Sequence, residues 1–542
     1  MKFLPPSPRP NYVGIARGHS EEEIFVFYRD EVDVRRCEVI KAPHYFYVPE
    51  ESSEDGEPGF VSMYGDPLRK LSFSCRSDFM RAKDRHRRMF ESDVQPLDRV
   101  LMDEYYNQPI PNVHCAFFDI EVDVKLSEGK GWSRPENPYA PVNAITVYQQ
   151  WADRYEVIAV PPKNSKWQAP DPKDWKMEGL TSTPILTLCE DETELLIKFL
   201  RAIEDADIIS GWNSEFFDLP YLYKRMVRPG MRSRLCFPEC EEPRENMTMR
   251  FGSEALTVRL YGRSHMDYLR MVDKFTFEGR TSFKLANVAE EELGVSKVEY
   301  EGTLEQLYND DFAEFVRYNF VDVHLIRMMD EKFKFVALVN QMAHENTVQF
   351  ESIMGTVKYV ETGIMNHAHY EMQLVGHDKA QRPGPKAEGA IVLTPKIGRH
   401  EWIASGDINS LYPSCARSLN MSPETMVGQF EKNEQDWRGI MVDHDDSDHV
   451  LITETGETFN GTGAEWEEII RQNGWVISGY GTVFDQKKPG IYAATLTHWF
   501  AERKRLQALK KKWGKEADRL REELGVELDD ETLTAVQAAL GR

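Results

Sequence analysis

The most informative stretch of the sequence is Phe117-Phe118-Asp119-Ile120-Glu121-Val122. Its run of apolar residues predicts a buried β-strand. Residues two apart in a strand point to the same face, so Asp119 and Glu121 are predicted to lie side by side. Burying two carboxylates together is costly unless a cation neutralises them. The pair is therefore either part of a metal site or one polar face of a sheet.

Strands and helices alternate around this stretch. Short apolar runs bounded by polar turns predict strands at Val113–Val124, Ala144–Tyr148, Tyr155–Val160 and Asp207–Gly211, and a later one at Trp402–Ile408. Asp191 is the predicted N-cap of a helix whose apolar residues recur at helical spacing. A β-hairpin is predicted at 246–260, followed by a mostly helical block from 285 to 373. We therefore expect an α/β protein.

Length and composition predict a multidomain globular protein. The chain has 542 residues, 41% hydrophobic and 29% charged, and at roughly 150 residues per domain it should form three or four domains. These values exclude disordered and collagen-like classes. No run approaches the roughly 18 apolar residues that span a membrane, and residues 1–10 lack a signal-peptide core, so we expect a cytoplasmic protein. Seven scattered cysteines predict no disulfide framework, and zinc at Cys236 and Cys240 is disfavoured because no second ligand pair is near.

The charge balance is acidic. Lys and Arg number 66 and Asp and Glu number 90, which gives a net charge of −24. This argues against binding nucleic acid over the whole surface, because neutralising phosphates requires clustered cations. Two basic runs, Arg76–Arg88 and Arg503–Lys515, are candidate anion sites. The alternative is that each run is a solvated helix face.

Two further segments carry acids. Asp218 follows the predicted strand at 207–211, and Tyr318 and Asp322 are four residues apart, one turn on the same helix face. Each segment alone is equally consistent with a surface acid or a partly buried tyrosine. Together with the first pair, they supply four acids and a phenol. These are the groups needed to bind two divalent ions at a phosphodiester. Hard cations prefer oxygen ligands, so Mg²⁺ or Mn²⁺ is expected.

The order and spacing of these segments resemble the three exonuclease motifs of the DEDD superfamily, in its tyrosine subclass. The resemblance implies a ribonuclease H-like 3′-5′ exonuclease domain with two metal ions. The implied metal ligands are Asp119, Glu121, Asp218 and Asp322. Tyr318 would orient the attacking water. The tyrosine subclass is favoured because Arg317 and Tyr318 stand where a histidine subclass would place its histidine.

A second candidate site lies at Ser405–Ser414. There a predicted strand ends in an acidic residue, and an aromatic residue follows after a turn. This stretch resembles motif A of family B DNA polymerases. The resemblance implies that Asp407 binds both metal ions of a polymerase site and that Tyr412 packs under the sugar of the incoming deoxynucleotide. A rigid tyrosine ring can exclude a 2′-hydroxyl. The backbone amides of Ser410 and Leu411 would cradle the triphosphate.

The resemblance covers nearly the whole chain and is closest to the replicative polymerases of tailed bacteriophages. Trp499–Lys504 is similar to the start of their fingers helix, where Arg503 would meet the nucleotide's phosphates. We expect this helix from about Ala493, interrupted near Gly514 and Gly525. The implied domains are an N-terminal domain at 1–105 with a return segment at 336–375, an exonuclease at 106–335, a partial palm at 376–488 and partial fingers at 489–542.

The sequence also departs from that family. Gln507 stands where a lysine is usual, followed by Lys510–Lys512, and Ala387 replaces a usual tyrosine. No Lys-x3-Asn-Ser-x-Tyr-Gly helix and no Tyr-Gly-Asp-Thr-Asp-like hairpin is present, and the acidic run Asp443–Asp448 is predicted to be a loop. A two-metal polymerase site needs a second palm aspartate. We therefore expect that this chain alone does not extend a primer.

These patterns predict the N-terminal part of a split replicative DNA polymerase with a proofreading exonuclease. A separate C-terminal polypeptide would supply the remaining palm and fingers, the thumb and contact with a sliding clamp. A truncated polymerase is the alternative, although the polar end at Leu528–Arg542 favours a natural terminus. Primer–template DNA and deoxynucleotides are the expected substrates, in the host cytoplasm during phage replication. Two other functions remain open: a stand-alone exonuclease, which the intact motif A disfavours, and a non-catalytic DNA-binding subunit, which the intact acids disfavour.

Overall fold

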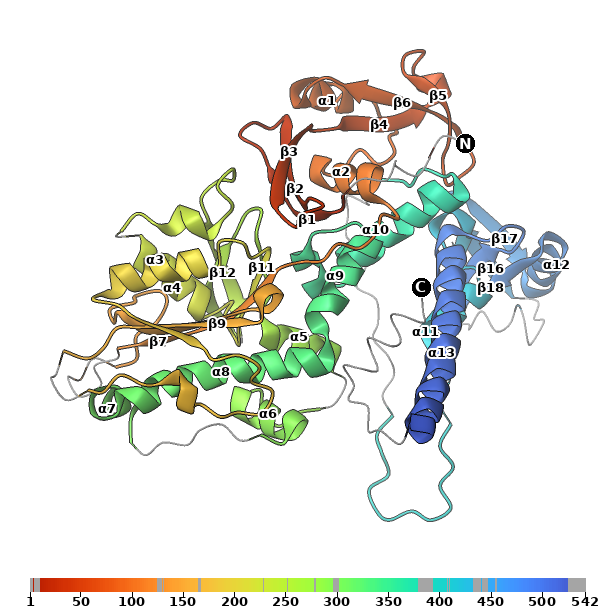
Figure 1. The fold of residues 1–542 in the computed structure, drawn as a ribbon. Coiled ribbons are helices and arrows are strands. Elements are labelled where there is room, and N and C mark those ends of the chain that lie inside the picture. Colours follow the sequence, from red (N-terminus) through yellow and green to blue (C-terminus); the bar gives the residue numbers. More distant parts are fainter. Residues whose placement is uncertain are drawn as a thin grey trace. The chain divides into compact units, whose positions relative to one another are not determined.

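A computed structural model describes the chain in several ranges. These are residues 3, 10–123, 129, 131–163, 167–227, 229–250, 252–276, 279–295, 302–378, 393–406, 408, 410–431, 440, 447–453 and 456–524. The chain forms two compact units, one of Met1–Pro58 and Arg69–Asn366 and one of Gly59–Leu68 and His367–Arg542. Both contain helices and strands, which confirms the predicted α/β class (Figure 1). The finer division into four domains remains a prediction.

Residues 12–73 contain two small antiparallel sheets. One has the order β1-β2-β3 and the other β4-β6-β5. Their strands are β1 (Tyr12–Arg17), β2 (Glu23–Arg29), β3 (Arg35–Lys41), β4 (His44–Pro49), β5 (Glu57–Val61) and β6 (Pro67–Phe73). Helix α1 (Arg76–Lys83) follows β6, and α2 (Pro96–Tyr105) packs on β1 through Val100 and Leu101. The basic run at 76–88 therefore includes a short helix.

A six-stranded mixed sheet forms the centre of the first unit, in the order β10-β9-β8-β7-β11-β14. Its strands are β7 (Cys115–Val122), β8 (Val142–Gln149), β9 (Arg154–Ala159), β10 (Ile185–Leu188), β11 (Ile208–Ser210) and β14 (Ser264–His265). Strand β7 pairs antiparallel with β8 and parallel with β11. The predicted strands from 113 to 211 are confirmed.

Helices cover both faces of this sheet, as Figure 1 shows for α3 (Glu192–Ala202) and α8 (Phe312–Phe333). Alternate residues of β7 enter different cores. Phe118 and Ile120 join the core that contains the apolar residues of α3. Cys115 and Phe117 join the core that contains those of α8. Because the side-chain period of a strand is two, Asp119 and Glu121 continue the row of Phe117 and face α8.

The remaining elements of the first unit connect or cover this sheet. The predicted hairpin is confirmed as β12 (Arg244–Arg250) and β13 (Ser253–Arg259), paired antiparallel. The helices are α4 (Asp218–Met226), α5 (Tyr268–Phe275), α6 (Leu285–Leu293), α7 (Leu304–Asp310), α9 (Phe335–Glu345) and α10 (Val357–His367). A single 3-10 turn, η6 (Phe350–Met354), joins α9 to α10. The helical block predicted from 285 to 373 is thereby confirmed.

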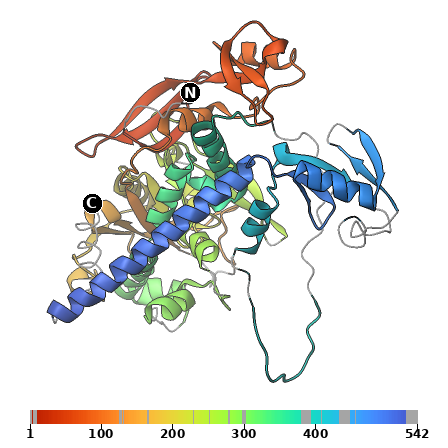
Figure 2. The ribbon, with the colours of Figure 1, turned by 90° about the vertical axis from the view of Figure 1, so that its right-hand side faces the viewer.

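The second unit holds a five-stranded antiparallel sheet in the order β17-β16-β15-β19-β18. Its strands are β15 (Met426–Phe430), β16 (Asp448–Ile452), β17 (Thr458–Thr462), β18 (Trp475–Ile477) and β19 (Thr482–Asp485). Helix α12 (Gly463–Asn473) packs Trp466 and Ile470 into the core of this sheet. Helix α11 (Leu411–Ser418) packs against the long helix α13 (Ile491–Leu524) (Figure 2).

Two predictions for the second unit are wrong. The strand expected at Trp402–Ile408 is absent from the described residues 393–406, where Trp402 is fully exposed and Ile403 is 73% exposed. A strand needs a neighbour to pair its backbone, and the sheet of this unit leaves that segment unpaired. The break expected at Gly514 is also absent, because α13 runs through it. One glycine costs a helix only about 1 kcal/mol, and the residues around it are good helix formers.

No helix among the described residues combines the length and apolar character needed to cross a membrane.

Candidate active site

Three carboxylates converge where β7 faces α8. Single oxygen atoms of Asp119, Glu121 and Asp322 all lie within 4.8 Å of one another. Asp119 and Glu121 are half-buried, whereas Asp322 is 6% exposed. Three like charges at this separation repel one another strongly, and a cation would relieve that repulsion. The structure thus brings together three of the four predicted metal ligands.

The fourth predicted ligand, Asp218, lies at the first residue of α4 and is buried. Its Oδ1 accepts a hydrogen bond from the amide of Ile120, at 3.2 Å, which ties it to the strand between Asp119 and Glu121. Burial raises the pKa of Asp218 to about 7, and the negative charges of Asp267 and Asp322 act in the same direction. The carboxylates of Asp218 and Asp322 are therefore electrostatic neighbours.

Tyr318 lies on α8 one turn before Asp322 and is half-buried. Residues four apart on a helix lie on one face, so the phenol belongs to the side of α8 that carries Asp322. Its ring packs against the core on that side of the sheet. The spacing predicted from the sequence is thereby confirmed, while the catalytic role of Tyr318 remains a prediction.

Two residues that the sequence analysis missed support the carboxylates. Asn319 donates a hydrogen bond from Nδ2 to Oδ2 of Asp119, at 2.8 Å. The hydroxyl of Thr146, on β8, donates to Oδ1 of Asn319 at 2.7 Å. Thr146 and Asn319 are fully buried, so these two hydrogen bonds orient Asp119 within the protein interior. The available signal was the position of Asn319, three residues before Asp322 and hence on the same helix face.

The donor set fits a hard divalent cation. All four predicted ligands are carboxylates, and no cysteine or histidine joins the cluster of Asp119, Glu121 and Asp322 among the described residues. Oxygen-only sites suit Mg²⁺, Mn²⁺ or Ca²⁺ rather than Zn²⁺, which prefers nitrogen and sulfur. Carboxylates that bind metal ions are typically held by a hydrogen bond from a neighbouring group, as the Asn319 amide holds Asp119.

The residues predicted for a polymerase site lie in the second unit. Ser410 directly precedes α11 and has a positive φ of 55°, and its hydroxyl accepts a hydrogen bond from Arg503 at 3.4 Å. The structure thus brings these two predicted nucleotide-binding residues together. Leu411 and Tyr412 are 44% and 77% exposed at the start of α11. Asp407 lies outside the described residues, as do Ala387, Gly525, the segment 528–542 and most of the acidic run at 443–448.

Two family models match consecutive parts of this chain. The model for the exonuclease domain of DNA polymerase family B matches residues 72–288, and the model for DNA polymerase family B matches residues 333–523. The chain belongs to DNA polymerase family B.

Individual members of this family are distant but similar. The chain is 27% identical over 403 residues to a DNA-directed DNA polymerase of Escherichia phage RB69, covering 69% of this chain and 43% of that protein. A DNA-directed DNA polymerase of Enterobacteria phage T4 is 27% identical over 402 residues, with the same shares. DNA polymerase 1 of Pyrococcus abyssi is 23% identical over 358 residues, covering 62% of this chain and 41% of that protein. The chain spans less than half the length of these relatives.

The two family B models divide the candidate residues unequally. Asp119, Glu121 and Asp218 fall within the exonuclease match, and Ser410 and Arg503 fall within the polymerase match. Asp322 lies between the two matches, so its place in the site rests on the carboxylate cluster.

Proposed function

We propose that this chain is a 3′-5′ exonuclease that removes nucleotides from DNA primer ends. The observation that carries the proposal is the cluster of Asp119, Glu121 and Asp322, with oxygens within 4.8 Å of one another, of which Asp119 and Glu121 lie inside the exonuclease-domain match. Asp119, Glu121, Asp218 and Asp322 would hold divalent ions, Mg²⁺ or Mn²⁺. When bound, such ions neutralise the scissile phosphate and lower the pKa of a bound water.

The residues of the chain have distinct tasks in this proposal. Asn319 holds the carboxylate of Asp119 in one orientation through its 2.8 Å hydrogen bond. The Ile120 amide does the same for Asp218. Tyr318, one turn from Asp322, positions the attacking water as in the tyrosine subclass of this superfamily. Holding reactants in a fixed geometry is itself a large part of catalysis.

The test uses a labelled primer–template with Mg²⁺. Asp119→Ala with Glu121→Ala should reduce primer shortening by about three orders of magnitude or more, because both changes remove ligands of the same ions. The matched control, Glu31→Ala with Glu38→Ala, removes two exposed carboxylates far along the chain from the site. Undiminished shortening by the first double variant would contradict the site. Absence of shortening by the unmodified chain would favour a non-catalytic DNA-binding subunit.

We further propose that the chain contributes the first part of a polymerase site, completed by a separate C-terminal polypeptide. The supporting observation in the second unit concerns residues 393–406 and 408, which pair with no strand of the described part of the chain although their apolar side chains are exposed; these include Leu393, Ile397, Trp402, Ile403 and Ile408. A β-strand from a second chain would pair this backbone and cover these side chains. In the proposal that chain also brings the second palm aspartate and the contact with a sliding clamp, in the host cytoplasm. A truncated form of one longer polymerase would leave the same segment unpaired.

A gel assay with and without deoxynucleotides tests this second proposal. The chain alone should shorten the primer in both conditions and make no longer product. Adding a polypeptide that carries the C-terminal part of a phage family B polymerase should give extension. Extension by this chain alone would contradict the proposal, since it would require a complete polymerase site within 542 residues.

A further inference from the structure

Two histidines of the second unit face each other where η7 (Ala368–Met372) contacts α13. His367 directly precedes η7, and His498 lies in α13. Their ring centroids are 5.3 Å apart, and the ring planes are tilted by 34°. His367 is half-buried and His498 is exposed. Neither the exonuclease proposal nor the polymerase proposal uses this pair.

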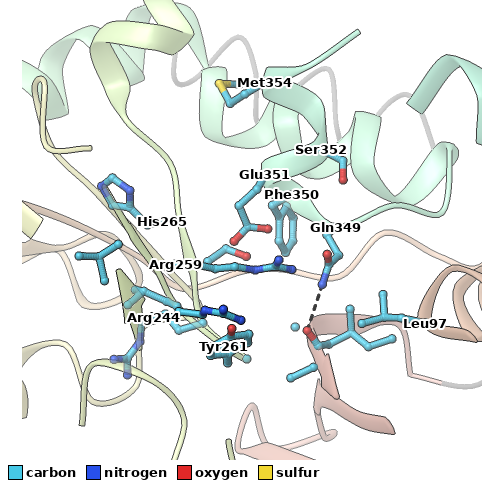
Figure 3. Close-up of a pocket in the computed structure, with 18 of the residues that line it drawn as sticks. Leu97, Arg244, Arg259, Tyr261, His265, Gln349, Phe350, Glu351, Ser352 and Met354 are labelled. Carbon is cyan, nitrogen blue, oxygen red and sulfur yellow. Dashed lines mark hydrogen bonds between the residues drawn. The ribbon is translucent and has the colours of Figure 1, made fainter. Parts of the chain in front are cut away.

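Two enclosed histidines of the first unit are held by hydrogen bonds, for comparison. Both ring nitrogens of His324 are hydrogen-bonded, at 2.7 Å each, to a tyrosine hydroxyl and to a backbone carbonyl. His265 lines a cavity of about 920 Å³ and is bonded to the hydroxyl of Ser214 at 2.9 Å (Figure 3). By contrast, His367 and His498 make no hydrogen bond within the described part of the chain. Their ring nitrogens are therefore not committed to the fold.

Each histidine of the pair has a carboxylate one helical turn further along. Glu371 follows His367 by four residues, and Glu502 follows His498 by four residues. Side chains four residues apart lie on one face of a helix. Glu371 interacts electrostatically with His367, and Glu502 interacts with His498. The contact between η7 and α13 is thus flanked by two imidazoles and two carboxylates.

The spacing and the protonation of the imidazoles suit a metal ion. Two imidazoles that bind one tetrahedral ion at the usual zinc–nitrogen distance have ring centres roughly 5 Å apart. The observed separation is 5.3 Å. Burial lowers the pKa of His367, and the neighbouring His498 acts in the same direction, against the opposing effect of Glu371. A neutral imidazole is the form that binds a metal, so His367 is ready to do so at neutral pH.

The helix geometry changes at this contact. η7 is a π-helical turn that continues α10 without a break. Such turns are rare and are found frequently at functional sites. This turn begins directly after His367 and contains Glu371, so it sets the placement of both side chains.

The two carboxylates reach the histidine pair by rotation of their side chains. Among the described residues, donors from three side chains lie within 4.8 Å of one another at the carboxylate cluster of the first unit and not here. Glu371 is exposed and forms no ion pair within the described ranges. Glu502 pairs with the exposed Arg505. Exposed ion pairs stabilise a protein little, so both carboxylates can turn toward an ion.

We propose that His367 and His498 bind a transition-metal dication, for which Zn²⁺ is the probe. Glu371 and Glu502 would complete its ligands. Imidazole nitrogen suits zinc, whereas Mg²⁺ and Mn²⁺ favour sites of oxygen alone. Two nitrogens and two oxygens supply the four ligands of a closed structural site, which would join η7 to α13. The site is separate from both proposed active sites and does not depend on their chemistry.

The test measures zinc affinity by competition with a chelating dye, in excess Mg²⁺ and on the full chain without a histidine tag. A background variant, Asp119→Ala with Glu121→Ala, keeps zinc from binding at the carboxylate cluster. In both backgrounds, His367→Ala with His498→Ala should weaken zinc binding by about tenfold or more, because loss of even a group that supports a metal ligand costs about that much. Bound zinc should also raise the melting temperature of the chain that keeps both histidines and not that of the histidine variant.

A matched control and a second variant separate loss of the site from loss of the fold. His19→Ala with His400→Ala removes two exposed imidazoles elsewhere and should keep the full zinc affinity. Glu371→Gln preserves the size of an exposed side chain and removes one ligand. It should weaken zinc binding while leaving the melting temperature without metal unchanged. Equal zinc affinity in the unmodified chain and in either the double histidine variant or Glu371→Gln would overturn the proposal.

Discussion

Asn319 shows how one buried amide can control a charged site. It bridges Thr146 on β8 and Asp119 on β7, so three elements meet at a single side chain. Because Asn319 is fully buried, each of its hydrogen bonds is made within the protein. An amide held in this way fixes the direction of the Asp119 carboxylate before any ion arrives.

We expect Asn319→Ala to lower exonuclease activity and metal affinity by about 10- to 100-fold, the range typical when a residue that holds a metal ligand in place is removed. The four proposed ligands stay in place, so the loss should shrink as the Mg²⁺ concentration rises. Primer shortening over a magnesium series measures this. Thr146→Val is the matched variant one hydrogen bond further away and should have a smaller effect. An unchanged magnesium dependence in Asn319→Ala would show that the amide has no part in metal binding.

His114 provides a second prediction at this scale. Its two ring nitrogens lie 2.8 Å from Asp205 and 2.9 Å from Asp33, and its ring stacks on Trp151. Burial lowers the pKa of His114, but the hydrogen bonds to the two carboxylates outweigh burial and raise it above the ordinary value. A histidine whose pKa is raised in the folded state stabilises the fold below its unfolded pKa, and that stabilisation is lost as pH rises through the folded pKa.

Unfolding by urea should therefore show a free energy that falls from about pH 6 to pH 8, in part because of His114. His114→Gln should reduce this fall, while His19→Gln, which removes an exposed imidazole, serves as the control. An identical pH dependence in all three proteins would mean that His114 has the same proton affinity in the folded and unfolded chains.

The spacing between neighbouring strands sets the position of the carboxylates. Gly211 directly follows β11, and a Cβ atom there would lie 2.6 Å from the carbonyl oxygen of Phe118 on β7. A glycine is needed because the two backbones approach too closely for any side chain. Strand β7, which carries Asp119, therefore lies so close to Gly211 that no side chain fits between the two backbones.

We expect Gly211→Ala to destabilise the fold by about 1–3 kcal/mol, the usual cost of overpacking. It should also reduce exonuclease activity, since relief of the clash moves β7 and with it Asp119. Thermal unfolding and primer shortening measure the two effects. The control Gly279→Ala places its Cβ in open space and should change neither. Normal stability in Gly211→Ala would show that β11 can shift without cost.

Elements also show where local propensity and packing disagree. The segment around Trp402 and Ile403 has the composition of a strand, yet it forms none because no neighbouring strand pairs with it. Helix α13 shows the converse, since it runs through Gly514, where local propensity predicts a break. In both cases the outcome depends on partners or flanking residues rather than on the residue itself.

At the scale of the whole molecule, the two proposed activities reside in different compact units. The carboxylate cluster belongs to the first unit, and Ser410, Tyr412 and Arg503 belong to the second. Each unit has its own sheet and its own hydrophobic core. Damage to one site should therefore leave the chemistry of the other intact.

We expect Asp407→Ala to abolish primer extension in a mixture with the proposed C-terminal polypeptide while leaving primer shortening at the level of the unmodified chain. The reason is that Asp407 is the proposed ligand of the polymerase ions and none of the exonuclease ligands. Both reactions are followed on one gel, with the exposed Asp448→Ala as the control. Extension that survives Asp407→Ala would remove this residue from the polymerase site.

Local spacing was enough to predict the strands around Phe117, the shared face of Asp119 and Glu121, and the one-turn separation of Tyr318 from Asp322. These features depend on the periods of strands and helices, which act over a few residues. The same spacing could not reveal that Asn319 reaches Asp119, because the two are 200 residues apart in the chain. It also could not show that Arg244 faces Arg259, because the register of a hairpin depends on its turn and on pairing along both strands. Contacts of this kind arise when the whole chain packs, and they define the carboxylate cluster.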